Sequence, residues 1–209
     1  MKHSALILII ILMSLGTSLA EEGTEYSLMK RYKRPFCDVN KTYRDDNLMC
    51  WAASVSNMVG FSLQYNPETA FANFKKKYKN QPKSTYNMLL AFFLSNGYSR
   101  SDFLVSTTTD NANFNKRIDL SIIGSLCQGR VVTIGVKLNK KATTGHALTV
   151  YGFETIKGRI YLLYVDSDDL RRKLYKDRIN CKKSITMFTT GRLKGQIIVS
   201  VVALKIFGE

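Results

Sequence analysis

A change in the pattern of apolar residues near residue 130 constrains the fold more than any other feature of the sequence. Before this point, apolar side chains recur at intervals of three and four residues, which is typical of helices. After it, runs of β-branched and apolar residues are separated by turn residues, which is typical of strands. The predicted helices are a segment that follows Cys50 and residues 67–78, 85–94 and 115–128, and the predicted strands are residues 131–138, 147–153, 159–165, 185–189 and 197–207. Helices followed by antiparallel strands predict an α+β fold.

Residues at the helix ends support these boundaries. Asn66 is a cap residue and is followed by proline at the first helical position. Ser84 caps the next helix, and Asn96-Gly97 ends it. A short segment containing Gly158 joins the second and third predicted strands, which predicts a hairpin.

The first twenty residues have the layout of a secretory signal peptide. A short basic start precedes an apolar run from Ala5 to Leu15, and small residues follow at Ser18 to Ala20. The apolar run is too short for a stable membrane anchor. We therefore expect residues 1–20 to be removed and residues 21–209 to form one secreted domain. The mature chain would have 189 residues (209 minus 20), enough for one sizeable core.

The charge balance is strongly basic. The chain has 31 lysines and arginines against 16 aspartates and glutamates, a net charge of +15, or +14 once Lys2 leaves with the signal peptide. Such a field favours acidic proteins, anionic polymers or a membrane surface as partners. The cations are spread along the chain, without the interleaved aromatic residues of an RNA-binding signature or a helix-turn-helix pattern. We therefore expect a solvated basic surface and no nucleic acid partner, and the oligomeric state stays open.

The mature chain has four cysteines: Cys37, Cys50, Cys127 and Cys181. An extracellular location permits disulfides. If Cys50 is a free thiol, at most one intramolecular disulfide can form; a Cys37–Cys181 bridge is one option, and the pairing stays open. Cys127 follows an apolar stretch and is expected to be a buried thiol. There is no CxxC or HExxH motif and only one histidine in the mature chain, so we expect neither a metal nor another cofactor.

Cys50 and His146 are the first candidates for catalysis. Cys50 stands where a loop enters an apolar helix, and the positive end of the helix dipole favours a thiolate, the form that attacks a carbonyl. His146 is the only histidine of the mature chain and lies at the start of a predicted strand. An imidazole can accept the thiol proton and protonate a leaving amine near neutral pH. Singly, each residue also fits a structural role, as a buried thiol or a core or surface histidine; together they favour catalysis.

A carboxylate is expected to hold the imidazole in its productive tautomer. Asp166 and Asp168 follow the strand 159–165, and the predicted hairpin would bring the end of that strand beside His146. The two aspartates are two residues apart, so an extended chain places both on one face. The hairpin favours Asp166 as the orienting residue, with Asp168 as a second support or a rival. An acidic turn without a catalytic role is the alternative.

Three stretches of the sequence carry a family resemblance. They are residues 38–53, with the segments DVNKTY, DDNLMC and AA; residues 146–152, HALTVYG; and residues 164–168, YVDSD. In these stretches and in their order, the chain resembles papain-like cysteine peptidases. More narrowly, it is similar to the streptococcal immunoglobulin-G-degrading endopeptidases of the IdeS type, the Mac family. The resemblance implies a papain-like α+β fold: N-terminal helices, with the catalytic cysteine at a helix N-terminus, packed on a C-terminal antiparallel β-sheet.

The resemblance also implies roles for five residues. Cys50 would be the nucleophile, His146 the general base and Asp166 the residue that orients the base. Asp168 would be a second acidic support. Lys41 would form the oxyanion hole together with the backbone N–H of Cys50, since a cation and an aimed N–H stabilise a tetrahedral oxyanion. Without the resemblance, Lys41 would be taken for a solvent-exposed lysine.

Two features depart from the immunoglobulin-cleaving enzymes. The segment between Cys50 and His146 is much shorter, which would remove surfaces that recognise an antibody. Trp51 follows the nucleophile where those enzymes carry a small residue, and an indole beside the thiol is expected to narrow the cleft. We therefore expect the chain to share the reaction of these enzymes more closely than their substrate.

The sequence therefore predicts a secreted cysteine endopeptidase that hydrolyses a host protein by a Cys-His-Asp mechanism, as a virulence factor, with immunoglobulin the leading substrate candidate. A related hypothesis keeps the same triad in a deamidase, an acyltransferase or a toxin. A third hypothesis is a non-catalytic basic protein that holds an acidic partner on a degenerate peptidase scaffold. The joint presence of Cys50, His146, Asp166 and Lys41 argues against the third, since a scaffold without activity has no physical need for the set.

Overall fold

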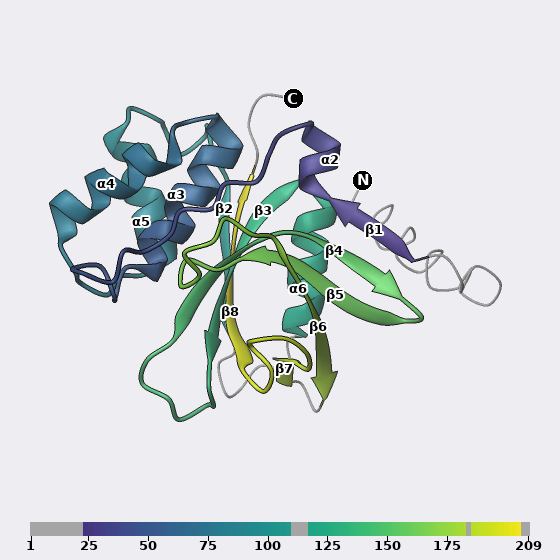
Figure 1. Cartoon of the computed structure of the whole chain (residues 1–209). Helices are drawn as coiled ribbons and strands as arrows, with labels where there is room; N and C mark the ends of the chain where they lie inside the picture. Colours follow the sequence, from purple (N-terminus) through teal and green to yellow (C-terminus); the bar gives the residue numbers. More distant parts are fainter. Residues whose placement is uncertain (1–22, 110–116, 183–184, 206–209) are drawn as a thin grey trace.

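The computed structural model describes residues 23–109, 117–182 and 185–205 (Figure 1). In chain order the elements are β1 (Thr24–Ser27), α2 (Leu28–Tyr32), α3 (Cys50–Leu63), α4 (Pro67–Tyr78), α5 (Thr85–Ser95), β2 (Val105–Thr109), α6 (Ile118–Cys127), β3 (Arg130–Lys137), β4 (His146–Ile156), β5 (Arg159–Val165), β6 (Tyr175–Lys182), β7 (Ile185–Phe188) and β8 (Ile197–Lys205). Helices α3, α4 and α5 lie together on one side of the strands (Figure 1). The predicted signal peptide lies outside the described residues. Within the described ranges, no helix is long and apolar enough to cross a membrane.

Six antiparallel strands form a closed barrel. Their order is β4-β3-β8-β7-β6-β5, and β5 pairs with β4 to close the ring. Two further strands add to it: β1 pairs with β4, and β2 pairs with β8. Helix α6 packs against β3 and β8. One hydrophobic core joins the barrel and the helices.

The barrel shows that the predicted papain-like α+β fold is wrong. Among the described residues, the first element is β1, a strand of the sheet, rather than a block of helices, and the later strands do not form an open C-terminal sheet. The physical reason is β6, a strand that was not predicted because its sequence, YKDRINCK, is rich in charged and polar residues. β6 pairs with β5 on one edge and with β7 on the other, so it is the strand that completes the ring.

The individual elements agree better with the sequence analysis. Helices α3, α4 and α5 lie where helices were predicted, and both predicted caps are confirmed, since Asn66 and Ser84 accept backbone N–H groups of the first helical turn. The five predicted strands correspond to β3, β4, β5, β7 and β8. Helix α6 begins at Ile118, and residues 115 and 116 of that prediction lie outside the described residues. The elements β1, α2, β2 and β6 were not predicted.

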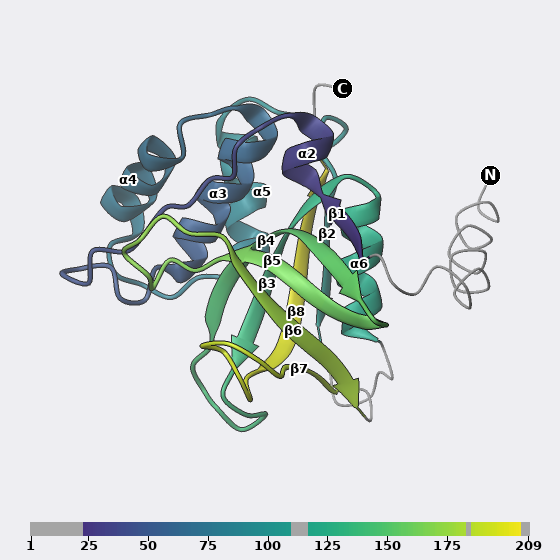
Figure 2. The ribbon, with the colours of Figure 1, turned by 45° about the vertical axis from the view of Figure 1, so that its right-hand side comes forward.

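β4 and β5 form the predicted hairpin, which turns at Gly158 with a φ of 68°, a value that suits glycine. Thr149 pairs with Val165, so the start of β4 lies beside the end of β5. Figure 2 shows these strands side by side, with the β5–β6 connection extending toward α3. The backbone N–H of Lys41, in the loop ahead of α3, donates to the carbonyl of Ser167 in that connection at 2.9 Å.

Helix α3 is buried from Trp51 to Ser62. It packs against α4 and α5 on one side and against β3 and β4 on the other, as expected for a helix that is largely apolar on all faces. Asn57, in its middle, accepts the N–H of Val39 at 2.9 Å, which ties the preceding loop to the helix. The packing of α3 on β4 brings its first residue, Cys50, to the start of that strand.

All four cysteines of the chain are free thiols. The Cys37–Cys181 bridge that the sequence left open is therefore not formed. Cys127 is exposed, so the expectation of a buried thiol is wrong. The reason is its position as the last residue of α6, where the helix reaches the surface.

Candidate active site

Cys50 and His146 meet where α3 and β4 begin. The Cys50 thiol is hydrogen-bonded to His146 and to the backbone N–H of Ala147. Cys50 is partly buried, and the side chain of His146 is 18% exposed, so both groups lie at the edge of the core. The two residues that the sequence pairs as nucleophile and base are therefore in direct contact.

Asp166 holds the other side of the imidazole. His146 Nε2 lies 2.6 Å from Asp166 Oδ1, which leaves Nδ1 for the thiol. Asp166 is 1% exposed, and its Oδ1 also accepts the backbone N–H of Asp168 at 2.9 Å. The β4–β5 hairpin thus places Asp166 beside His146, as expected from the sequence.

Asp168 and Lys41 form an ion pair on the same side as the thiol. Lys41 Nζ lies 2.5 Å from Asp168 Oδ1 and donates to the carbonyl of Asn47 at 2.9 Å. Asp168 Oδ1 is 3.8 Å from His146 Nδ1. Lys41 is only 3% exposed, so it is not the solvated lysine that its sequence position alone suggests. A buried ammonium needs such a partner, because taking an unpaired charge out of water is costly.

The loop that carries Lys41 is fixed by Asp46, a residue to which the sequence analysis gave no role. Its buried carboxylate accepts the backbone N–H groups of Thr42 and Tyr43 and the Thr42 hydroxyl at 2.8–3.0 Å, and Lys75 Nζ lies 3.3 Å away. Burial alone would raise the pKa of Asp46, but these hydrogen bonds lower it overall. They hold Tyr43 at a φ of 61°, a conformation rare outside glycine. An aspartate ahead of a helix is a common signal and did not single this residue out.

Arg192 is a second contributor that the sequence analysis missed. Its Nε lies 3.3 Å from Asp166 Oδ2, and a terminal nitrogen lies 3.7 Å from Asp169. Arg192 belongs to the turn between β7 and β8, which only the closed barrel brings to the β5–β6 connection. Gly191 precedes it with a φ of 69°, and a side chain there would collide with the carboxylate of Asp177. No local pattern in the sequence marks Arg192.

The surrounding charges favour a thiolate–imidazolium pair. Burial alone would raise the pKa of Cys50, but hydrogen bonds from His146 and Ala147 and the charges of His146 and Lys41 lower it overall. Burial alone would lower the pKa of His146, but its hydrogen bonds to Asp166 and Cys50 and the nearby carboxylates raise it to about 9. The pKa of Asp166 is lowered despite burial, chiefly because His146 donates to it. A stabilised thiolate beside a protonated imidazole is the arrangement that nucleophilic cysteine chemistry needs.

Trp51 does not narrow the cleft, so that expectation is wrong. The indole is 3% exposed and packs edge-on against Phe74 and Tyr78 of α4. Its Nε1 donates to the carbonyl of Gln81 at 2.8 Å. Successive side chains diverge by about 100° around a helix, so Trp51 turns into the helical core while Cys50 faces β4.

His146, Asp166 and Asp168 are also the one group among the described residues whose ligand atoms lie close enough to hold a metal, within 4.8 Å of one another. Both carboxylates already contact a cation: Asp168 pairs with Lys41 and Asp166 with Arg192. These side chains supply positive charge where a metal would sit. The contacts therefore favour a chain of ion pairs over a metal centre.

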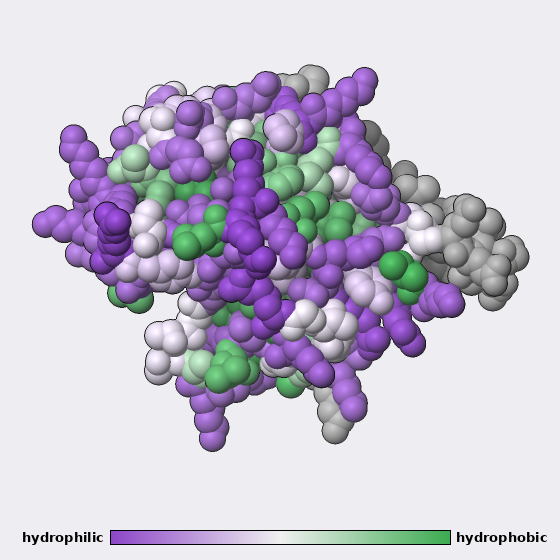
Figure 3. Space-filling model, viewed as in Figure 1, coloured by the Kyte–Doolittle hydropathy of each residue, from purple (hydrophilic) through white to green (hydrophobic). Residues whose placement is uncertain are grey.

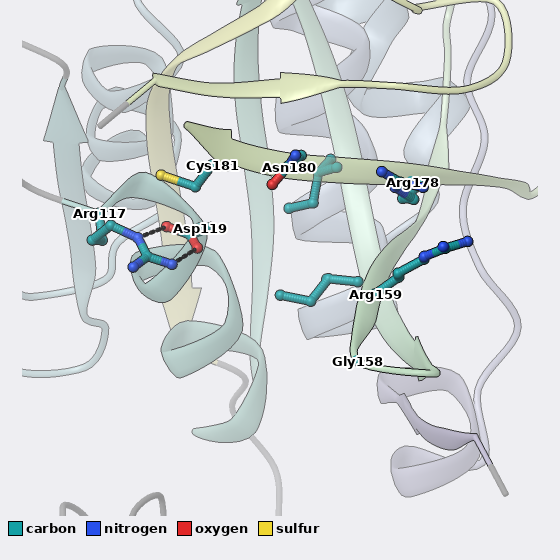
Figure 4. Close-up of a pocket in the computed structure, with 9 residues that line it drawn as sticks. Arg117, Asp119, Gly158, Arg159, Arg178, Asn180 and Cys181 are labelled. Atoms are coloured by element: carbon teal, nitrogen blue, oxygen red, sulfur yellow. Dashed lines mark hydrogen bonds and ion pairs between the residues drawn. The ribbon is translucent and has the colours of Figure 1, made fainter. Parts of the chain in front are cut away.

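A cavity of about 220 Å³ lies elsewhere, between α6 and the strands β5 and β6 (Figure 4). In it, Arg117 forms a two-pronged ion pair with the buried Asp119, at 2.6 and 2.9 Å. Arg159 and Arg178 point away from this pair (Figure 4). The charges of Arg117 and Asp119 thus satisfy each other, and the cavity shares no residue with the Cys50 site.

The chain matches no protein-family model, and no curated protein is significantly similar to it in sequence. The chemistry of the site is therefore inferred from the chain's own residues.

Proposed function

We propose that this protein is a secreted cysteine endopeptidase. The observation that carries the proposal is the continuous contact from the Cys50 thiol through His146 to the buried carboxylate of Asp166. A thiol, an imidazole and an orienting carboxylate in this order are the parts of a nucleophile activated by a base. The contact does not depend on a papain-like fold, because such sites recur on unrelated folds.

In the proposed mechanism, the Cys50 thiolate attacks the carbonyl carbon of the scissile bond and forms a carbon–sulfur bond. The tetrahedral oxyanion collapses as the carbon–nitrogen bond breaks and His146 gives its proton to the leaving amine. A water then attacks the thioester while His146 accepts one of the water protons. The carbon–sulfur bond breaks, the carboxylic product leaves, and the thiolate and imidazolium are restored.

The oxyanion would be stabilised by the first N–H of α3 and by Lys41. The N–H of Cys50 belongs to the first turn of a helix, where backbone N–H groups have no partner within the helix. The ammonium of Lys41 is close enough for its charge to help lower the pKa of the thiol. Both groups would therefore stabilise the negative charge that develops on the oxyanion beside Cys50. Asp168 would hold Lys41 in place through their ion pair.

The first test compares wild type with Cys50→Ala on host serum proteins, immunoglobulins included, with the products mapped by mass spectrometry. We expect wild type to cut at least one of them, and the variant to lose activity by about 10³-fold or more, because the nucleophile is gone. Labelling by a thiol-reactive epoxide should disappear with it. Cys127→Ala is the matched control, since this exposed thiol lies at the end of α6, outside the site.

Product masses separate this proposal from the other uses of the same site. A gain of about one dalton would indicate a deamidase, and a cross-linked product would indicate an acyltransferase. Full cleavage by a correctly folded Cys50→Ala protein, checked by circular dichroism, would overturn the proposal. Binding of a serum protein, with no covalent change in any of the serum proteins, would favour the hypothesis of a non-catalytic basic binding protein instead.

A further inference from the structure

Four loops frame the candidate active site, and we call them the rim loops. Each carries or directly precedes residues of the site: 38–49 for Lys41 and Cys50, 138–145 for His146, 166–174 for Asp166 and Asp168, and 189–196 for Arg192. A substrate bound at the thiol would therefore lie beside these loops.

The exposed charges of the rim loops are almost all positive. Eight of their cations are exposed: Arg44, Lys140, Lys141, Arg171, Arg172, Lys173, Arg192 and Lys194. Their one exposed acid is Asp45, which pairs with Lys75 at 2.5 Å. Outside the rim loops, the described residues expose fourteen cations and three acids, so the rim loops share the basic character of the surface and differ from the rest in exposing a single, paired acid.

The other acids of the rim loops face inward. Asp38, Asp46, Asp166 and Asp169 are each 7% exposed or less, and Asp168 pairs with Lys41. Some of the exposed cations form ion pairs with these acids. A terminal nitrogen of Arg171, for example, lies 3.1 Å from a carboxylate oxygen of Asp169. Carboxylates inside and cations outside nevertheless leave a positive potential toward solvent.

The rim loops also carry exposed apolar side chains. Seven large hydrophobic residues are exposed among those described, and four of them, Tyr43, Leu48, Leu138 and Leu170, lie in these loops. Figure 3 shows apolar residues in small patches between projecting hydrophilic side chains on one face of the molecule. Mixed apolar and cationic contacts suit a polypeptide better than a nucleic acid or a sulfated glycan, which offer few aliphatic groups.

We propose that the rim loops bind an acidic stretch of a polypeptide substrate, with aspartate or glutamate residues on both sides of an apolar segment that is cut. This inference rests on the proposed peptidase function. The positive rim would concentrate acidic segments near the thiol and speed their association, an effect that salt screens. The leucines and Tyr43 would contact the apolar side chains between the acidic flanks.

The test uses two quenched-fluorescence peptide libraries with the same randomised apolar core and flanks of either glutamate or glutamine. At about 20 mM salt, we expect kcat/KM for the glutamate library to be about tenfold higher, and the difference to shrink toward twofold at about 200 mM. Equal rates for both libraries would overturn the inference but leave the peptidase proposal standing. Cleavage of neither library would overturn both.

Two charge-reversal variants show whether the rim is the cause. Lys140→Glu/Lys141→Glu reverses two exposed charges of a rim loop and should remove most of the preference for glutamate over glutamine. Lys157→Glu/Arg159→Glu makes the same change in charge at the far end of the β4–β5 hairpin, about 30 Å along the strands, and should keep the preference. Equal loss in both variants would contradict a local role of the rim. Tight binding of a labelled oligo-dT that only the rim variant loses, without a preference for glutamate, would assign the rim to nucleic acid and overturn the inference.

Discussion

His146 connects the candidate catalytic groups at the scale of single residues. It lies between the thiol of Cys50 and the carboxylate of Asp166, and Asp168 adds a second negative charge beside it. These contacts raise its pKa to about 9 from an ordinary 6.5. The imidazolium that would protonate a leaving amine is therefore present up to about pH 9, and it is lost as the pH rises further.

Removing the charge of Asp166 should lower the pH above which the imidazolium of His146 is lost. In Asp166→Asn the imidazole loses its charged hydrogen-bond partner, so its pKa should fall toward 6.5 and the alkaline limb of kcat/KM should shift to lower pH by one unit or more. The rate at pH 7 should drop by about 10³-fold, since the amide also favours the wrong tautomer. The pH–rate profile and the titration of His146 by NMR measure both effects.

Asp168→Asn is the comparison for this prediction. Asp168 lies 3.8 Å from the imidazole instead of 2.6 Å, so its removal should lower the pKa of His146 less. An alkaline limb that stays near pH 9 in Asp166→Asn would show that Asp166 does not set the charge of the imidazole.

At the scale of elements, local signals in the sequence were enough for most of the structure that holds the site. Asn66 and Ser84 mark two helix starts by their caps, and Gly158 marks the hairpin turn. β6 escaped prediction because its buried residues, among them Asp177, are not all apolar. Asp177 is satisfied by the hydroxyl of Tyr164 at 2.7 Å, a contact that exists only once β5 and β6 pair. Periodicity cannot find a strand whose inward face is partly charged.

Alanine substitutions at two helical glycines are expected to change the stability of the protein in opposite directions. A side chain at Gly60 of α3 would come within 2.9–3.2 Å of Pro67, Cys37 and Tyr65, so Gly60→Ala should lower the free energy of unfolding by about 1–3 kcal/mol. A side chain at Gly124 of α6 would meet nothing within 4 Å, so Gly124→Ala should raise it by about 1 kcal/mol through helix propensity. Urea unfolding measures both. If Gly60→Ala were also stabilising, α3 would be packed less tightly than its contacts indicate.

At the scale of the whole molecule, barrel closure assembles groups that are distant in the chain. Cys50, the proposed nucleophile, lies at the start of a helix, His146 at the start of β4, Asp166 directly after β5, and Arg192 in the β7–β8 turn. The sequence analysis found Cys50 from its place ahead of an apolar helix, and it related Asp166 to His146 because a hairpin is a local structure. It missed Arg192 because closure depends on pairings among β5, β6, β7 and β8 that no single segment encodes. The fold class was wrong for the same reason, although the Cys–His–Asp contact was anticipated.

Hydrogen exchange can test the closure directly. Among the described residues, strand β6 is paired on both edges, to β5 and to β7, whereas β1 pairs only with β4 and β2 only with β8. In a closed barrel the interior amides of β6, such as Ile179, should exchange at least about 10²-fold more slowly than the outward-facing amides of β1 and β2, because only the latter form an open edge. NMR-detected exchange at neutral pH measures this ratio, with β3, paired to β4 and β8, as the internal standard for a protected strand. If alternate amides of β6 exchanged as fast as those of β1, the ring would be open beside β6, and Arg192 would lose the structure that holds it against Asp166.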